Sequence, residues 1–108
     1  MTPRQAGTRA LAGAALLMLG TAPGALAADD LQVQVLAASC ANCHGTDGNS
    51  PGAIPRIGGR PQAALARQLR EFKAGTVAGA TVMTRIAKGY SDEQLDTLAR
   101  YFAERPRR

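Results

Sequence analysis

The cysteines and the histidine of this chain are concentrated in one short segment. Its two cysteines, Cys40 and Cys43, and its single histidine, His44, lie within five consecutive residues. Residues three and four apart are neighbours on one face of a helix, so these three side chains are expected to project from a single turn. No other feature constrains the fold as strongly, because this turn predicts the attachment of a prosthetic group.

The spacing Cys-x-x-Cys-His predicts covalent attachment of one haem c. Cys40 and Cys43 are expected to form thioether bonds to the haem vinyl groups, and His44 is expected to bind the iron. Three other interpretations fit less well. A zinc site needs further ligands, a thioredoxin-like dithiol needs neighbouring strands, and a disulfide across two residues would be strained and stabilise little.

Residues 1–27 are predicted to be a cleaved export signal. They combine basic Arg4 and Arg9, an apolar run over residues 10–20 and a small-residue cleavage site at 25–27. The apolar run is shorter than the roughly 20 residues that a membrane-spanning helix needs, so no stable membrane insertion is expected. Residues 28–108 are then expected to form one soluble, periplasmic domain that carries a single haem and ends in a short basic tail.

Composition bears on the partners and the stability of this domain. Losing the positive charges of Arg4 and Arg9 lowers the formal net charge from +5 to +3, and residues 28–104 hold eight basic and eight acidic side chains. This balance argues against nucleic-acid binding, which favours a basic face with stacking aromatics. The basic tail, 105–108, is expected to be solvated or to steer a partner. A domain this small is only marginally stable without a cross-link or a bound group, and a bound cofactor would supply that stabilisation.

The apolar periodicity is helical throughout and predicts an all-α fold of about four short helices around the haem. The first helix is expected to be capped by Asp29 or Asp30, to place Leu31, Val35 and Ala38 at helical spacing, and to lead into Cys40. Three later helices are expected: one that starts near Pro61 and ends before Gly75, one over 83–88 that ends at a left-handed Gly89, and one that begins with a capping box of Ser91 and Gln94 and ends before Pro106.

The second iron ligand is identified by elimination as Met83. Met1 and Met18 leave with the export signal, and Met83 is the remaining methionine, in a loop between helices. A core-filling role is the plain alternative for any methionine. Thioether ligation favours ferrous iron and raises the reduction potential. With both axial positions filled, the chain is predicted to be an electron carrier and not an enzyme by itself.

Three further residues are candidates for contacts around the haem. A backbone carbonyl near Pro55 is expected to accept a hydrogen bond from the ring nitrogen of His44 that does not bind iron. Arg56 and Arg60 are candidates for pairing with the haem propionates, or for plain solvation, and Arg56 is preferred between the two.

These features together resemble the class I c-type cytochromes over nearly all of residues 28–108. The resemblance rests on the helix that leads into CANCH at 40–44, the proline-containing loop at 54–59, the ligand methionine and the aromatic pair near the end of the last helix. It implies that the first and last helices cross, that Cys40 and Cys43 attach the haem, and that His44 and Met83 bind the iron.

More narrowly, residues 36–40 and 80–93 are similar to the cytochrome subunit of flavocytochrome c sulfide dehydrogenases. That resemblance implies an FAD-containing flavoprotein partner that oxidises sulfide and passes electrons to the haem. Some relatives carry two haem domains, whereas this chain has one motif and would accept one electron at a time. A free periplasmic shuttle between a respiratory complex and a terminal oxidase or reductase is the alternative. A ligand sensor is a third possibility that a six-coordinate haem disfavours.

Overall fold

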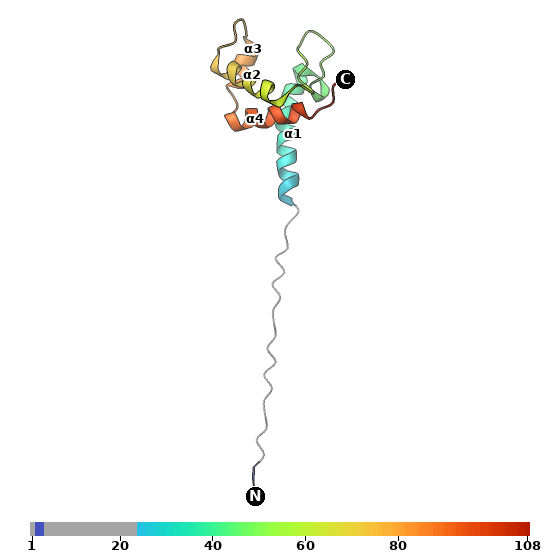
Figure 1. The fold of residues 1–108 in the computed structure, drawn as a ribbon, viewed down its shortest axis with the longest axis vertical. Helices are drawn as coiled ribbons and strands as arrows, with labels where there is room; N and C mark the ends of the chain where they lie inside the picture. The colour runs from blue at the N-terminus through green and yellow to red at the C-terminus, as the bar shows by residue number, and fades with distance from the viewer. Residues whose placement is uncertain (1, 4–23) are drawn as a thin grey trace.

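The computed structural model describes residues 2, 3 and 24–108, with the backbone alone for 24–29 (Figure 1). Its elements are α1 (Gly24–His44), a 3-10 turn η1 (Thr46–Gly48), α2 (Gln62–Ala74), α3 (Val82–Ala87) and α4 (Asp92–Ala103). The described ranges contain four α-helices and no strand, which confirms the predicted all-α class. The predicted export signal, 1–27, lies mostly outside these ranges. Among the helices of the described part, none is long and apolar enough to cross a bilayer.

Helix α1 begins earlier than predicted. The capping role assigned to Asp29 or Asp30 is wrong in this chain, because α1 starts at Gly24 and runs through both residues. Residues 24–28 read Gly-Ala-Leu-Ala-Ala, and alanine and leucine are among the strongest helix formers. The helix therefore extends in the N-terminal direction past both aspartates.

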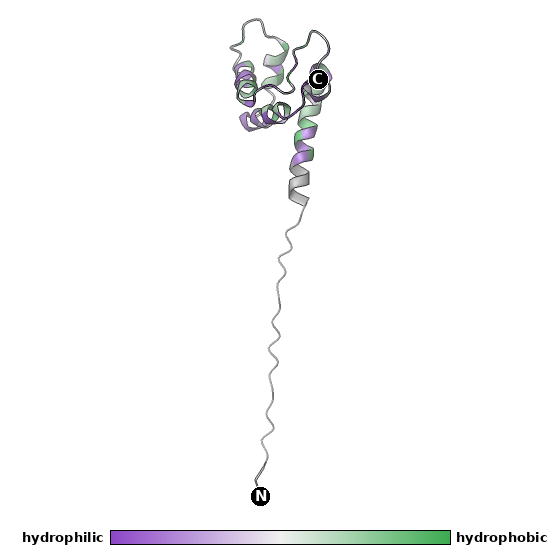
Figure 2. Ribbon diagram, turned by 45° about the vertical axis from the view of Figure 1, so that its right-hand side comes forward, coloured by the Kyte–Doolittle hydropathy of each residue, from purple (hydrophilic) through white to green (hydrophobic). Residues whose placement is uncertain are grey.

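The face of α1 that packs is also not the predicted face of Leu31, Val35 and Ala38. Leu31 and Val35 are 61% and 65% exposed, and Ala38 is exposed as well. Ala37 is buried, and Leu36 and Cys40 pack against the core. The reason is geometric: α1 crosses α4 near its C-terminal half, and its N-terminal turns extend away from the other helices (Figures 1 and 2).

Helices α2 and α4 form the largest helix–helix contact and hold most of the core. Their boundaries agree with the prediction. The capping box is present, with Gln94 N donating to Ser91 Oγ over 3.2 Å and Ser91 N donating to Gln94 Oε1 over 2.9 Å. Gly75 ends α2 in the left-handed conformation, with φ of 74°, which a residue without a Cβ adopts without strain. These ends fix the length of the two helices that pack on each other.

The end of α3 differs from the prediction at Gly89. This glycine was expected to terminate the helix in the left-handed region, but its φ is not positive. The chain instead leaves α3 through Lys88 in a right-handed conformation, and Gly89 N and Tyr90 N donate to Ile86 O and Ala87 O over 3.0 and 3.2 Å. The helical turn thus continues up to Tyr90, which ties that residue rigidly to α3.

The loop after His44 is folded back by Gly48. The carbonyl of Gly48 accepts hydrogen bonds from Ile57 N and Gly58 N over 2.9 and 3.0 Å. Gly48 has a φ of 73°, and a Cβ there would lie 2.7 Å from Gly58 N, so this approach requires a glycine. The fold-back closes the loop that carries Pro55 beside the end of α1.

The C-terminal tail is bound to this loop, which corrects the expectation that it is only solvated. Asn49 Nδ2 donates to Pro106 O over 2.8 Å, and Arg108 N donates to Asn49 Oδ1 over 3.1 Å. The Arg108 guanidinium lies 3.4 Å from the Asp47 carboxylate, and Gly59 N donates to Phe102 O over 2.8 Å. The tail therefore acts as a strap across the loop of residues 45–59.

Replacing Asn49 with alanine is expected to lower the free energy of unfolding by about 1–2 kcal/mol. The reason is that the tail loses its hydrogen bonds with both the amide nitrogen and the amide oxygen of Asn49. Urea unfolding of the haem-containing protein, followed by helical circular dichroism, measures this change. Asn42→Ala, at an exposed position in α1, is the matched control and should leave stability nearly unchanged. Equal stability of the two variants would show that the strap contributes nothing.

Candidate haem-binding site

A cavity of about 800 Å³ lies between the four helices and the loop of residues 45–59. Its walls are predominantly apolar and include Ile57, Leu65, Leu69, Phe72, Leu98 and Phe102. Cofactor sites are typically concave, apolar and of this size, with a few polar groups that fix orientation. The cavity takes the place of part of the core, since the buried cluster itself is small.

The C-terminal turn of α1 supplies both thiols to one wall of this cavity. Cys40 is half-buried and Cys43 is exposed, and neither is in a disulfide. Burial raises the pKa of the Cys40 thiol, although a hydrogen bond with Ser39 acts in the opposite direction. The predicted grouping of Cys40, Cys43 and His44 on one turn is present.

His44 is oriented by a backbone carbonyl. Its Nδ1 lies 2.6 Å from Pro55 O, and the residue is 9% exposed. A carbonyl oxygen only accepts, so Nδ1 carries the proton and donates. Nε2 is then the ring nitrogen left to bind a ligand. The contact expected near Pro55 is thus found in the structure, and Pro55 also lines the cavity.

Met83 lies on a second wall, formed by α3. It was expected in a loop between helices and also at the start of a helix over 83–88. The structure places it in the first turn of α3, which agrees with the helix and corrects the loop. Thr84 Oγ1 donates back to Ala80 O over 3.3 Å at this helix start, and α3 packs on α2. A half-buried thioether on a packed helix is held more firmly than one on a free loop.

Of the two candidate arginines, only one lines the cavity. Arg56, which was preferred, is exposed and is not among the described residues that line the cavity. Arg60 is half-buried in the cavity wall, and its Nη1 donates to Gln68 Oε1 over 3.0 Å. The fold-back of the loop on Gly48 turns residue 60 inward and leaves residue 56 outside. Arg60 is the only permanently charged side chain among the described lining residues.

Sequence reasoning missed three polar residues of the cavity wall. Gln68 holds Arg60, and Ser39 and Tyr90 share a hydrogen bond of 2.8 Å. One signal was available for Gln68, which interrupts the otherwise apolar face of Leu65, Leu69 and Phe72. No local pattern marks Ser39 and Tyr90, because they are far apart in the chain.

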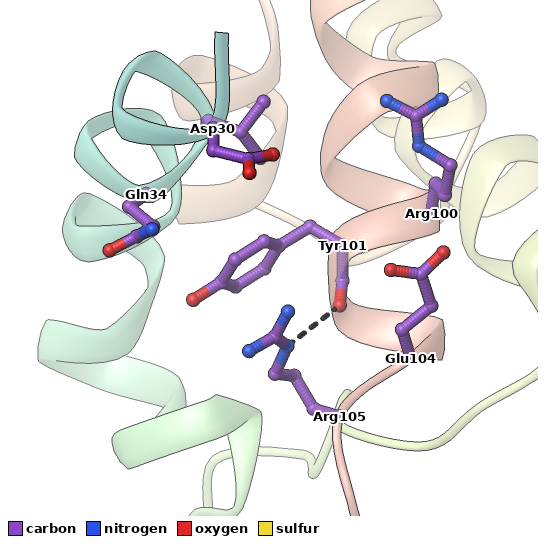
Figure 3. A pocket seen from close by; sticks show the side chains of 7 residues that line it. Asp30, Gln34, Arg100, Tyr101, Glu104 and Arg105 are labelled. Carbon is purple, nitrogen blue, oxygen red and sulfur yellow. Dashed lines mark hydrogen bonds between the residues drawn. The ribbon is translucent and has the colours of Figure 1, made fainter. Parts of the chain in front are cut away.

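A second, smaller hollow of about 380 Å³ lies between α1 and α4 (Figure 3). Its walls carry charges of both signs from Asp30, Arg100, Glu104 and Arg105. Arg105 closes it by lying 4.0 Å from the ring centre of Tyr101 while its Nε donates to Tyr101 O over 3.2 Å. This contact stabilises the end of α4 where the strap begins.

The main cavity fits a haem by the chemistry of its walls. An apolar interior suits the porphyrin, two thiols on one helical turn suit its vinyl groups, and one guanidinium suits a propionate. An oriented imidazole and a thioether lie on different walls, where they can bind iron from two sides.

Comparison with known proteins agrees with this arrangement. Residues 32–105 match the family model described as Cytochrome c. The chain therefore belongs to the cytochrome c family, and it binds haem c covalently through the Cys-x-x-Cys-His motif that contains Cys40 and Cys43.

Among its relatives is the cytochrome subunit of sulfide dehydrogenase of Chlorobaculum tepidum, 46% identical over 69 residues, which are 64% of this chain and 62% of that protein. Cytochrome c4 of Stutzerimonas stutzeri is 38% identical over 82% of this chain and 47% of its own length. The thiosulfate dehydrogenase electron acceptor of Thiomonas intermedia is 43% identical over 63% of this chain and 32% of its own length. The chain thus spans less than two thirds of each of these relatives.

Proposed function

We propose that this chain is an exported, periplasmic electron carrier whose haem iron is bound by His44 and Met83 and receives electrons from an FAD-containing sulfide dehydrogenase subunit. The observation that carries the ligation is the placement of these two side chains on different walls of one cavity, beside the two cysteines. The sulfide dehydrogenase relative supports the partner.

The bound haem supplies the exchange of one electron between ferric and ferrous iron. The residues of the chain set the conditions for that exchange. Pro55 O holds the His44 ring in the tautomer that presents Nε2, and the Met83 thioether favours the ferrous state. The Arg60 guanidinium, held by Gln68, offsets the negative charge of a propionate. The apolar walls exclude water and limit the charge rearrangement that accompanies the transfer.

The face around the cavity also supports a redox partner with an acidic surface. Ile54, Val82 and Ile86 line the cavity and are 44%, 63% and 41% exposed. No acidic residue occurs between Glu71 and Asp92, whereas this segment holds the exposed Arg85 and Lys88. Two basic residues of helix α2 are in ion pairs, Arg70 with Asp96 and Lys73 with Asp92. Among the described residues, Arg85 and Lys88 have no such pair.

A relative named as a thiosulfate dehydrogenase electron acceptor supports a second candidate donor. The experiment that separates them mixes the purified ferric protein with a sulfide dehydrogenase flavoprotein and sulfide, or with a thiosulfate dehydrogenase and thiosulfate. We expect fast reduction of the haem only in the first mixture. Fast reduction only in the second would replace the flavoprotein with the other donor, and reduction in neither, with fast reduction by respiratory membranes, would support the free shuttle.

Reversing the charge of Arg85 is expected to slow reduction by the flavoprotein about three- to tenfold at low ionic strength, because steering by charge depends on this face. The effect should fade at high salt as the charges are screened. Stopped-flow measurement of haem reduction tests Arg85→Glu against Arg100→Glu, which changes the net charge equally at an exposed position of α4. Equal slowing by both variants would place the docking face elsewhere.

A further inference from the structure

One exposed hydrogen bond joins two residues of the haem cavity wall. Ser39 Oγ and Tyr90 OH lie 2.8 Å apart, and both residues line the cavity. Ser39 Oγ also lies 2.9 Å from Leu36 O, to which it donates. A serine hydroxyl has a single proton, so Tyr90 must donate to Ser39. Tyr90 is thus the donor of this hydrogen bond, because the proton of Ser39 is used within its own helix.

This bond links the two walls that carry the proposed iron ligands. Ser39 adjoins Cys40 in the last turns of α1, and Tyr90 N donates to Ala87 O at the end of α3. Helix α3 packs chiefly on α2. Within the described ranges, the Ser39–Tyr90 contact is the only hydrogen bond or ion pair between α1 and residues 75–91.

We propose that Ser39 and Tyr90 are positioning residues whose hydrogen bond holds the α3 wall, and with it Met83, closed against the α1 wall. The bond thereby sets how readily an added ligand displaces Met83. This inference rests on the proposed ligation by Met83. Some ligands bind only when Met83 has moved away from the iron, which we call the open state. The apparent affinity of such a ligand is reduced in proportion to the fraction of molecules in the open state. Loss of the bond raises that fraction.

Titration of the ferric protein with imidazole tests the inference through the visible absorption of the haem. Tyr90→Phe removes only the hydroxyl group, and it is expected to tighten imidazole binding about fivefold, the effect of one ordinary hydrogen bond. Tyr101→Phe is the matched control, because this half-buried tyrosine lies outside the cavity, and it should bind imidazole like the unchanged protein. Amide hydrogen exchange of α3 should quicken in Tyr90→Phe but not in Tyr101→Phe.

Ser39→Ala provides the second variant, and the double variant tests that both act through one bond. Each single change should tighten imidazole binding, and the double change should do so no more than Tyr90→Phe, because a shared interaction is lost only once. If Tyr90→Phe lowers the unfolding free energy but leaves imidazole binding and α3 exchange unchanged, the residue only adds stability and the inference is wrong.

Met83→Ala distinguishes failure of this inference from failure of the proposed ligation. Imidazole should bind Met83→Ala far more tightly than the unchanged protein, because no ligand has to be displaced. If both proteins bind imidazole equally, Met83 is not the ligand and the proposed ligation fails together with the inference built on it. If Met83→Ala binds more tightly but Tyr90→Phe and Ser39→Ala do not, only the Ser39–Tyr90 inference is overturned.

Discussion

Replacing His44 with alanine is expected to abolish the low-spin haem spectrum altogether. His44 is the only histidine in the chain, so no second imidazole can take its place. The residue is also nearly buried and is oriented through Nδ1 by Pro55 O, so its removal leaves a gap that water fills as a weaker ligand. Absorption and electron paramagnetic resonance spectra of the purified ferric protein measure the change.

The matched control for His44 is Pro55→Ala, which keeps the carbonyl that accepts the hydrogen bond. We expect this variant to retain the low-spin spectrum. Haem should stay attached after denaturation in the unchanged protein, in His44→Ala and in Pro55→Ala, because all three keep Cys40 and Cys43. A low-spin spectrum that survives in His44→Ala would show that another group binds the iron.

Replacing Met83 with alanine is expected to leave the haem attached but to open one axial position. Axial ligands set haem potentials over a range of about 0.8 V, so we expect the potential to fall by on the order of 0.1 V when the thioether is lost. The reduced variant should also bind carbon monoxide at neutral pH, which the unchanged protein should resist because its iron has no vacant position. Redox titration and carbon monoxide difference spectra provide the two measurements.

Ile86→Ala is the matched control for Met83, because Ile86 lies on the same helix and lines the same cavity. It removes apolar contact without removing a thioether. We expect its potential to stay close to that of the unchanged protein. An unaltered potential in Met83→Ala, or an equal fall in both variants, would contradict ligation by Met83.

The parts of the site that could be predicted from the sequence are those determined by local spacing. Cys40, Cys43 and His44 share a turn because residues three and four apart on a helix are neighbours. The capping box of Ser91 and Gln94 likewise depends on four consecutive residues. Gly89 shows the limit of such signals, since a glycine after a helix permits a left-handed end but does not require one.

The face that α1 presents could not be predicted in this way. Leu31 and Val35 were expected on its packed face, yet they are exposed, whereas Ala37 is buried and Leu36 packs against the core. The choice depends on where α4 crosses α1, and the small side chain of Ala37 allows a close approach of the two helices. Periodicity within one helix contains no information about the position of another.

The sequence by itself determined the prosthetic group, its attachment residues and the helical class, because each depends on residues close together in the chain. Only the tertiary structure decided that Arg60 and not Arg56 enters the cavity, that Asn49 fastens the C-terminal tail, and that Tyr90 reaches Ser39. These contacts join residues far apart in sequence. They exist because the loop folds back on Gly48 and the helices pack around the cavity, and neither the path of a loop nor the packing of helices is encoded in local spacing.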